Sequence, residues 1–144
     1  MNRISISIGL LAMSASALGQ TADDRAAVKR AALDYLEGFY EGSTDKIRRS
    51  VHPDAHKFGF YFDDGIYKSE PMSFEEMLNY ADGVKTSGNY PDKNAAKRVE
   101  ILDVLDQTAV VKVHAWWGSD YMTLARYDEK WMIVQVLWQT LPES

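Results

Sequence analysis

Few side chains of this chain can take part in chemistry, because it contains no cysteine and only three histidines. Without cysteine there is no thiolate nucleophile, thiolate metal ligand or disulfide. The three imidazoles, His52, His56 and His114, lack the short spacing of a metal-binding helix, so we expect no metal site. The spacings of a serine triad, a phosphate-binding glycine loop and a dinucleotide fingerprint are also missing, so we expect no cofactor.

Two of the four tryptophans stand side by side in the stretch "HAWWGSDY", residues 114–121. Gly118-Ser119 predicts a two-residue hairpin turn, which pairs Trp117 with Asp120. Adjacent residues of a strand point to opposite faces of the sheet, so only one of the two indoles can enter the core. This register assigns Trp117 to the core face and Trp116 to the opposite face, and a longer turn would change both assignments.

Two helices are expected in the first part of the chain. Apolar residues recur at three- and four-residue spacing from about Arg25 to Glu41, which predicts an amphipathic helix ending at Gly42. A second, shorter helix follows, capped by Ser43 or Thr44 and ended by His52-Pro53.

An aromatic hairpin and a third helix come next. The segment "HKFGFYFDDGIYKS", residues 56–69, places three phenylalanines on one face of a strand and supplies Asp63-Asp64-Gly65 as the turn. Ser73 and Glu76 form a capping box that predicts the start of the third helix, which we expect to end near Gly83.

From Lys97 onward the hydrophobic period becomes two, which predicts four strands in an antiparallel meander. The turn at Asp128-Glu129 pairs Leu124 with Ile133 and Arg126 with Trp131. One face of the meander is the expected core side; it carries Val111, Val113, Ala115, Trp117, Met122 and Leu124. The opposite face is too apolar for a sheet that simply faces water. We therefore expect a homodimer through Trp116, Tyr121, Val134, Val136 and Trp138, with packing by the chain's own tail as the alternative.

The first residues resemble a secretory signal peptide. Arg3 is followed by the apolar run Ile4 to Leu11 and by a small-residue cleavage site that ends at Ala17 or Gly19. The run is shorter than the roughly 20 residues that cross a bilayer, so we expect no membrane contact after cleavage. We expect residues 1–19 to be removed, residues 20–144 to form one domain, and the product to be secreted or periplasmic. The net charge of −5 argues against nucleic-acid binding.

The order of these elements resembles the nuclear transport factor 2-like superfamily. The resemblance is carried by "AALDYLEGFYEGSTDKIRRSVHPDA", "TAVVKVHAWW" and "DYMTLARYDEKWMIV", and it covers roughly residues 24–139. It is closest to the putative lumazine-binding branch, beside the SnoaL-like cyclases and the ketosteroid isomerases. It implies an α+β fold in which a cone-shaped, curved antiparallel sheet wraps around a long N-terminal helix (a cystatin-like roll). It also implies a pocket at the open end and frequent dimerisation.

The resemblance also nominates site residues. Its pocket would be lined by Phe39, His52, Phe58, Phe60, Trp117 and Met122. In the isomerase relatives an aspartate after the second helix is the general base. Asp54 matches that passage, with Tyr35 or His56 assisting, unless Asp54 belongs to a surface turn and Tyr35 to the core. Near Trp117 the chain offers no convincing second acid except Asp120 at the turn.

Three functions remain open from the sequence. The leading hypothesis is an exported protein that binds a small apolar or aromatic molecule in an aromatic-lined pocket, without demonstrated catalysis. The first alternative is a cofactor-independent isomerase, cyclase or dehydratase that uses Asp54 as its base. The second is a protein-interaction module that acts through the outer face of the sheet.

Overall fold

The computed structural model of this protein describes the backbone of residues 13–141 and the side chains of residues 22–141. The predicted signal peptide, residues 1–19, lies outside the part of the chain whose side chains are described, so it stays a prediction. In chain order the elements are α1 (Met13–Glu41), α2 (Thr44–Ser50), β1 (Val51–Asp63), β2 (Ile66–Pro71), α3 (Phe74–Ser87), β3 (Arg98–Val104), β4 (Thr108–Ala115), β5 (Gly118–Tyr127) and β6 (Lys130–Thr140).

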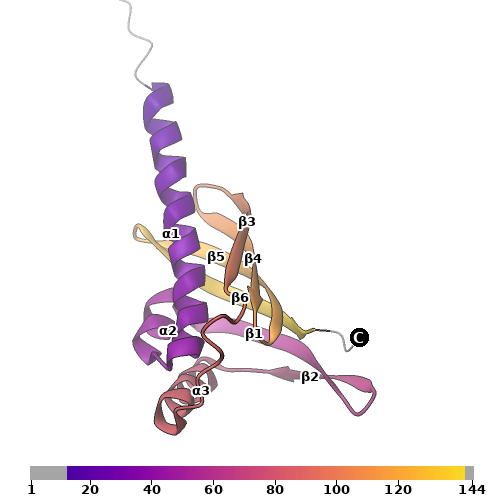
Figure 1. The fold of residues 1–144 in the computed structure, drawn as a ribbon. Helices are drawn as coiled ribbons and strands as arrows, with labels where there is room; N and C mark the ends of the chain where they lie inside the picture. Colours follow the sequence, from indigo (N-terminus) through magenta and orange to yellow (C-terminus); the bar gives the residue numbers. More distant parts are fainter. Residues whose placement is uncertain (1–12, 142–144) are drawn as a thin grey trace, which may run out of the picture.

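One curved sheet and one long helix make the two layers of the fold (Figure 1). The strand order is β2-β1-β6-β5-β4-β3, and every neighbouring pair is antiparallel except β1 with β6, which is parallel. Helix α1 crosses one face of the sheet, and α3 lies beside the C-terminal end of α1. The predicted α+β roll is therefore confirmed, with a mixed sheet in place of a wholly antiparallel one.

The core lies between α1 and the sheet. On α1 the predicted periodicity is confirmed, because Val28, Ala32 and Leu36 are fully buried at four-residue spacing. The facing side chains come from β4, β5 and β6 and are the alternate residues of each strand, including Val111, Val113, Met122, Leu124 and Ile133. No helix in the described part of the chain is long and apolar enough to cross a membrane.

The local signals for helix ends are largely confirmed. Ser43 caps α2, and Ser73 and Glu76 form the complete capping box of α3. Helix α3 nevertheless continues past the expected stop at Gly83 and ends at Gly88, whose φ of 70° is in the left-handed region. The reason is the periodicity, since the next apolar residue, Val84, packs inward and holds another turn in the helix.

The turn between β4 and β5 differs from the prediction. Ala115 pairs with Gly118, so the two turn residues are Trp116 and Trp117. Gly118 has a φ of 144°, and a Cβ there would overlap the carbonyl of Gln139, so only glycine allows this residue to pair closely with β6. The pairing shifts by an even number of residues, which leaves the strand faces as predicted. Its main effect is to move Asp120 away from the turn and into β5, opposite the buried Val113.

A β-bulge in β6 overturns part of the predicted interface. Leu124 pairs with Ile133 as expected, but β6 then carries one extra residue at Val134 before the ladder resumes. The bulge turns Val136 and Trp138 toward the α1 side of the sheet. Both assignments to the outer face are therefore wrong. The homodimer itself stays a prediction.

Candidate functional site

A cavity of about 180 Å³ opens at the end of the sheet where the β4–β5 turn, the β1–β2 hairpin and α3 meet. Its walls are mainly aromatic and combine side chains from seven different parts of the chain. The lining residues are Phe39, Lys57, Glu70, Met72, Tyr80, Trp116, Trp117 and Trp138. Only two of them, Lys57 and Glu70, carry a charge, so any ligand here meets an apolar surface with few polar contacts.

Lys57 is the buried charged group of this cavity. Strand β1 runs parallel to β6 and pairs Lys57 with the buried Val136, which directs the lysine toward the α1 side. The residue is only 9% exposed. Its Nζ lies 4.6 Å from the ring centre of Phe39, 5.2 Å from that of Tyr35 and 6.0 Å from that of Trp117. The aromatic faces partly compensate the loss of hydration of the ammonium group.

A chain of hydrogen bonds connects Lys57 to a buried carboxylate. Lys57 Nζ donates to Tyr35 Oη over 2.8 Å, and Tyr35 Oη donates to Asp120 Oδ2 over 2.7 Å. Trp117 Nε1 donates to the other oxygen, Asp120 Oδ1, over 2.6 Å. Tyr35 and Asp120 are fully buried, so this relay runs from the cavity wall into the core.

Burial shifts the pKa values of Lys57 and Asp120, the two ends of this relay, in the directions that favour their neutral forms. Desolvation lowers the pKa of Lys57 to about 8, although the charge of Asp120 opposes the shift. Desolvation likewise raises the pKa of Asp120, against the effects of Lys57, Trp117 and Tyr35. The pKa of Tyr35 is raised well above its usual value by burial and by Asp120, so its hydroxyl stays protonated.

The aromatic wall is fixed by edge-to-face contacts. Trp117 lies 5.7 Å from Phe39 and 6.4 Å from Tyr35 between ring centres, and Phe39 lies 5.6 Å from Tyr80. Tyr40 on α1 holds the tryptophan turn in place, because its Oη accepts a hydrogen bond of 2.9 Å from the Trp116 backbone N–H. Helix α1 therefore positions both the relay and the turn.

Trp138 closes the cavity on the β6 side. Its indole lies over Gly59 of β1, where any Cβ would overlap the ring, so the glycine is what allows this close approach. Its Nε1 is buried and has no hydrogen-bond partner among the described residues. An unpaired buried donor of this kind costs about 1–3 kcal/mol.

A second hollow of about 500 Å³ adjoins the cavity and shares Phe39, Tyr80 and Trp116 with it. The loop from Asn89 to Ala95 forms its far side. Trp116 lines both spaces and is 49% exposed, so its side chain forms part of the boundary between them.

The structure brings three of the predicted site residues together and leaves the others elsewhere. Phe39 and Trp117 line the cavity, and Tyr35 is the centre of the relay behind it. Asp54 does not reach this site, because β1 is irregular between Val51 and His56 and the Asp54 side chain is 93% exposed.

The two histidines predicted beside Asp54 also lie outside the cavity. His52 stacks on Tyr127, with ring centres 4.8 Å apart, and its Nδ1 accepts a hydrogen bond from the Asp54 N–H. His56 is exposed. His114 lies on the outer face as expected, where its Nε2 is 2.8 Å from Glu100 Oε1. In the described part of the chain, no three acidic or histidine side chains converge as metal ligands would.

The remaining pocket assignments are corrected by the faces of β1 and β5. Phe58 and Phe60 do share one face, but it is the outer one, and they are 41% and 38% exposed. Met122 is fully buried in the core and does not line the cavity. Because side chains alternate along a strand, an outward Phe58 requires an inward Lys57.

Reasoning from the sequence misses Lys57 and places Asp120 only at a turn. A signal for Lys57 was present in the alternation of "HKFGFYF", which puts the lysine and Gly59 on one face and the phenylalanines on the other. Hydrophobicity alone favours the phenylalanine face as the inner one, and this assumption was wrong. For Asp120 the sequence offers no comparable signal, because the backbone conformation of Gly118 is known only from the structure.

Comparison with known proteins identifies the family. The model of the family described as "Putative lumazine-binding" matches residues 23–139. An aldolase from Cladobotryum sp, named FrzH, is 25% identical over 129 residues, covering 85% of this chain and 95% of its own.

Solved structures show the same fold. An NTF2-like protein with a cystatin-like fold from Novosphingobium aromaticivorans aligns with a TM-score of 0.66 at 15% identity, covering 94% of each chain. An NTF2-like protein of unknown function from Silicibacter pomeroyi aligns with a TM-score of 0.63 at 17% identity, covering 84% of this chain and 98% of the other. The resemblance inferred from the sequence is confirmed: the chain shares its fold with these NTF2-like structures, and it belongs to the family described as "Putative lumazine-binding".

Proposed function

We propose that this protein binds a small, flat, largely apolar molecule in the aromatic cavity and that Lys57 contacts an oxygen atom of that molecule. The observation that carries the proposal is the position of Lys57, a buried ammonium group in a wall made mostly of aromatic rings. Membership of a family of small-molecule-binding NTF2-like proteins agrees with this function.

The shape of the cavity supports a flat ligand. Its volume of about 180 Å³ suits one or two fused rings rather than a steroid. The indoles of Trp117 and Trp138 and the ring of Phe39 supply surfaces for stacking or edge contacts.

The donors around the cavity support an oxygen on the ligand. An ammonium group has three N–H donors, and among the described residues Lys57 uses one of them, on Tyr35. A carbonyl or carboxylate oxygen can accept from the others.

A binding experiment tests this proposal. Lumazine, riboflavin, benzoate and acetophenone are titrated while tryptophan fluorescence and the melting temperature are recorded, because a bound ligand stabilises the folded state by mass action. We expect saturable quenching by at least one oxygen-bearing ring compound and weaker binding in Lys57→Met. The exposed Lys130→Met is the matched control. Equal affinity in Lys57→Met and the wild type would contradict the role of Lys57.

Carbon–carbon bond chemistry of the aldol type is a second candidate function. The similar FrzH is named an aldolase, and a lysine in an aromatic cavity is a group that can polarise the carbonyl of an aldol. The test is release of benzaldehyde from 4-hydroxy-4-phenylbutan-2-one by the wild type and not by Lys57→Met. A rate equal to that of buffer alone would reject this candidate.

We also propose that the chain is exported and that cleavage occurs near Gly19, on the strength of the N-terminal sequence pattern. Expression of the full chain in a Gram-negative bacterium, followed by cell fractionation and N-terminal sequencing, tests this. Recovery of the uncleaved chain from the cytoplasm would contradict it.

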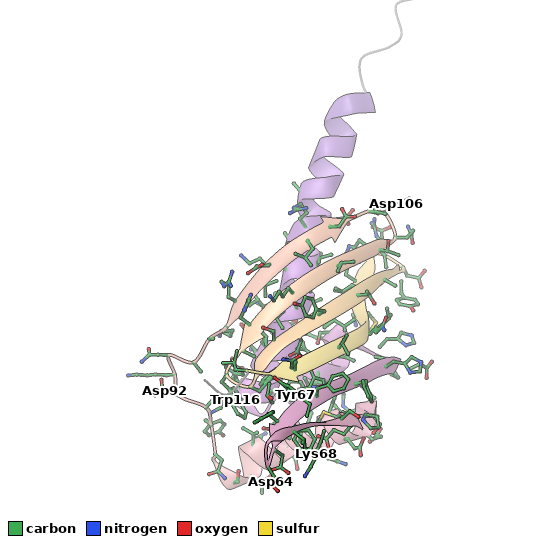
Figure 2. The ribbon with its side chains drawn as sticks, turned by 90° about the vertical axis from the view of Figure 1, so that its right-hand side faces the viewer. Asp64, Tyr67, Lys68, Asp92, Asp106 and Trp116 are labelled. Atoms are coloured by element: carbon green, nitrogen blue, oxygen red, sulfur yellow. The ribbon has the colours of Figure 1, made fainter. Side chains whose placement is uncertain are left out.

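We also propose that two copies of the chain form a dimer through the sheet face opposite α1. Figure 2 shows that no helix covers this face, on which the paired residues Tyr121 and Leu137 are 48% and 45% exposed. We expect light scattering to give twice the mass of one chain and Leu137→Asp to reduce it. A single-chain mass for the wild type at micromolar concentration would reject the dimer.

A further inference from the structure

We propose that Lys57 is a nucleophile and that its Nζ forms an imine with the carbonyl carbon of an aldehyde or ketone bound in the cavity. This inference rests on the proposed binding function and adds the class of ligand, a carbonyl compound, and a covalent step. It is carried by three observations: Lys57 lines the cavity, aromatic rings surround it, and a hydrogen-bonded relay leads from it to a buried acid.

The first requirement of an imine-forming lysine is access to the carbonyl. Lys57 extends from β1 to the cavity surface, and its Nζ lies among the rings of Phe39, Tyr35 and Trp117. The surrounding rings limit the entry of water, which protects an imine from hydrolysis. A surface lysine is accessible to a carbonyl compound but lacks this protection from water.

The second requirement is a neutral amine, and the relay provides a path for the proton. The ammonium of Lys57 transfers a proton to Tyr35 Oη while Tyr35 transfers its own proton to Asp120. The product is a neutral amine, an intact tyrosine and a protonated carboxylic acid. Burial lowers the free-energy cost of this uncharged arrangement, and the pKa shifts of Lys57 and Asp120 have the corresponding directions.

The covalent step then balances without any cofactor. The lone pair of Nζ attacks the carbonyl carbon, a C–N bond forms, and the carbonyl π electrons move to the oxygen. The oxygen takes up a proton and the nitrogen loses one, which gives a carbinolamine. Protonation of its hydroxyl, for which the acid of Asp120 can return its proton through Tyr35, breaks the C–O bond and releases water. The nitrogen remains joined to carbon as a protonated imine.

Titratable groups near Lys57 come from four elements around the cavity. They are Tyr35 on α1, Asp120 on β5, Glu70 on β2 and Tyr80 on α3. Asp120 and Glu70 are the acids of this set. The charge of Asp120 raises the pKa of Lys57 and burial lowers it more strongly, so removal of Asp120 must lower the pKa further.

Reductive trapping with benzaldehyde tests the inference. The protein is incubated with benzaldehyde and sodium cyanoborohydride at neutral pH, and the benzylated lysines are identified by peptide mass spectrometry. The exposed Lys130 of the same molecule is the internal reference. We expect labelling of Lys57 to be at least about tenfold faster, because a pKa near 8 leaves far more free amine at neutral pH than an ordinary lysine has.

Two variants separate a nucleophile from a purely structural lysine. Lys57→Arg keeps a positive charge but forms no stable imine, so we expect it to lose the fast labelling while labelling of Lys130 is unchanged. Asp120→Asn removes the charge that favours the ammonium form, so the midpoint of the labelling-against-pH curve should move below that of the wild type. A merely structural lysine would show no fast labelling and no such shift.

The outcomes distinguish this inference from the binding proposal. Benzoate cannot form an imine, so its quenching of tryptophan fluorescence reports binding alone. If benzoate binds but Lys57 is labelled no faster than Lys130, the imine inference is overturned and the binding function stands. If benzoate, benzaldehyde and the other ring compounds all fail to bind or label, both are overturned.

Discussion

The Nζ of Lys57 lies 2.8 Å from the hydroxyl oxygen of Tyr35, and the two residues are 22 positions apart in the chain. This contact joins the cavity to the core, because the same hydroxyl donates a hydrogen bond to the buried Asp120. The hydroxyl is thus the only atom between two buried groups of opposite charge, and changes at this position should affect both stability and binding.

Replacement of Tyr35 by phenylalanine should destabilise the protein by about 2 kcal/mol. The change keeps the ring but leaves the Lys57 ammonium and the Asp120 carboxylate without their shared partner. Urea unfolding measures the effect. The exposed Tyr90→Phe is the control and should change the free energy of unfolding by less than about 0.5 kcal/mol. A Tyr35→Phe variant as stable as this control would show that the relay contributes nothing to stability.

The stability of the protein should increase with pH above about 8, and Lys57 should be the cause. The pKa of Lys57 is lowered to about 8 in the folded state, while a lysine in the unfolded chain titrates near about 10.4. Between these values the unfolded state holds more protons than the folded state, so the free energy of unfolding rises with pH. Below pH 8 both states are protonated and the contribution is constant.

The matching measurement is urea unfolding of wild type and Lys57→Met between pH 7 and 10.5. The free energy of unfolding of the wild type should increase by about 3 kcal/mol relative to that of Lys57→Met as the pH rises over this range. Lys130→Met, a change at an exposed lysine, should follow the wild type. A wild-type curve parallel to that of Lys57→Met would mean that Lys57 has an ordinary pKa.

Substitution of two glycines should have opposite effects. In Gly59→Ala the new methyl group overlaps the Trp138 indole, so we expect a loss of about 1–3 kcal/mol and altered tryptophan fluorescence. In Gly83→Ala, on α3, the methyl group meets no atom, so we expect a gain of about 0.5–1 kcal/mol from helix propensity. Thermal unfolding of both variants checks the contrast, which fails if Gly59→Ala is neutral.

Asp34 should stabilise the contact between α1 and the end of α2. Its carboxylate accepts two hydrogen bonds from Arg49, of 2.6 and 2.8 Å, and lies 3.0 Å from Arg30. Burial alone would raise the pKa of Asp34, but the two arginines outweigh it and hold the pKa below its usual value. Arg49 is half exposed, so solvent screening limits the expected loss in Asp34→Asn to about 1 kcal/mol.

The pH dependence of this loss has a definite sign. A lowered carboxylate pKa stabilises the protein above the unfolded value of about 3.9, and the stabilisation disappears as the pH falls through the folded value. The difference in the free energy of unfolding between wild type and Asp34→Asn should therefore be largest at pH 6 and should disappear in strong acid. A gap that persists at pH 2 would show that the ion pair is not its source.

Local features of the fold follow from the sequence because neighbouring residues decide them. The capping box of Ser73 and Glu76 satisfies backbone groups within one turn of helix. The tight turn at Asp64-Gly65 requires positive φ angles, here 52° and 81°, that aspartate tolerates and glycine prefers. The order of such elements was also enough to indicate the superfamily.

The site itself depends on the tertiary structure. Alternation along β1 determined that Lys57 and Phe58 point to opposite sides, but the side that faces α1 depends on the parallel pairing of β1 with β6. The bulge at Val134, which places Trp138 beside the cavity, arises in the antiparallel ladder of β6 with β5. A strand sequence specifies which residues share a face. Which face is buried depends on the elements that pack against the sheet. Because α1 packs against the face that carries Lys57 and Asp120, these two residues belong to one site.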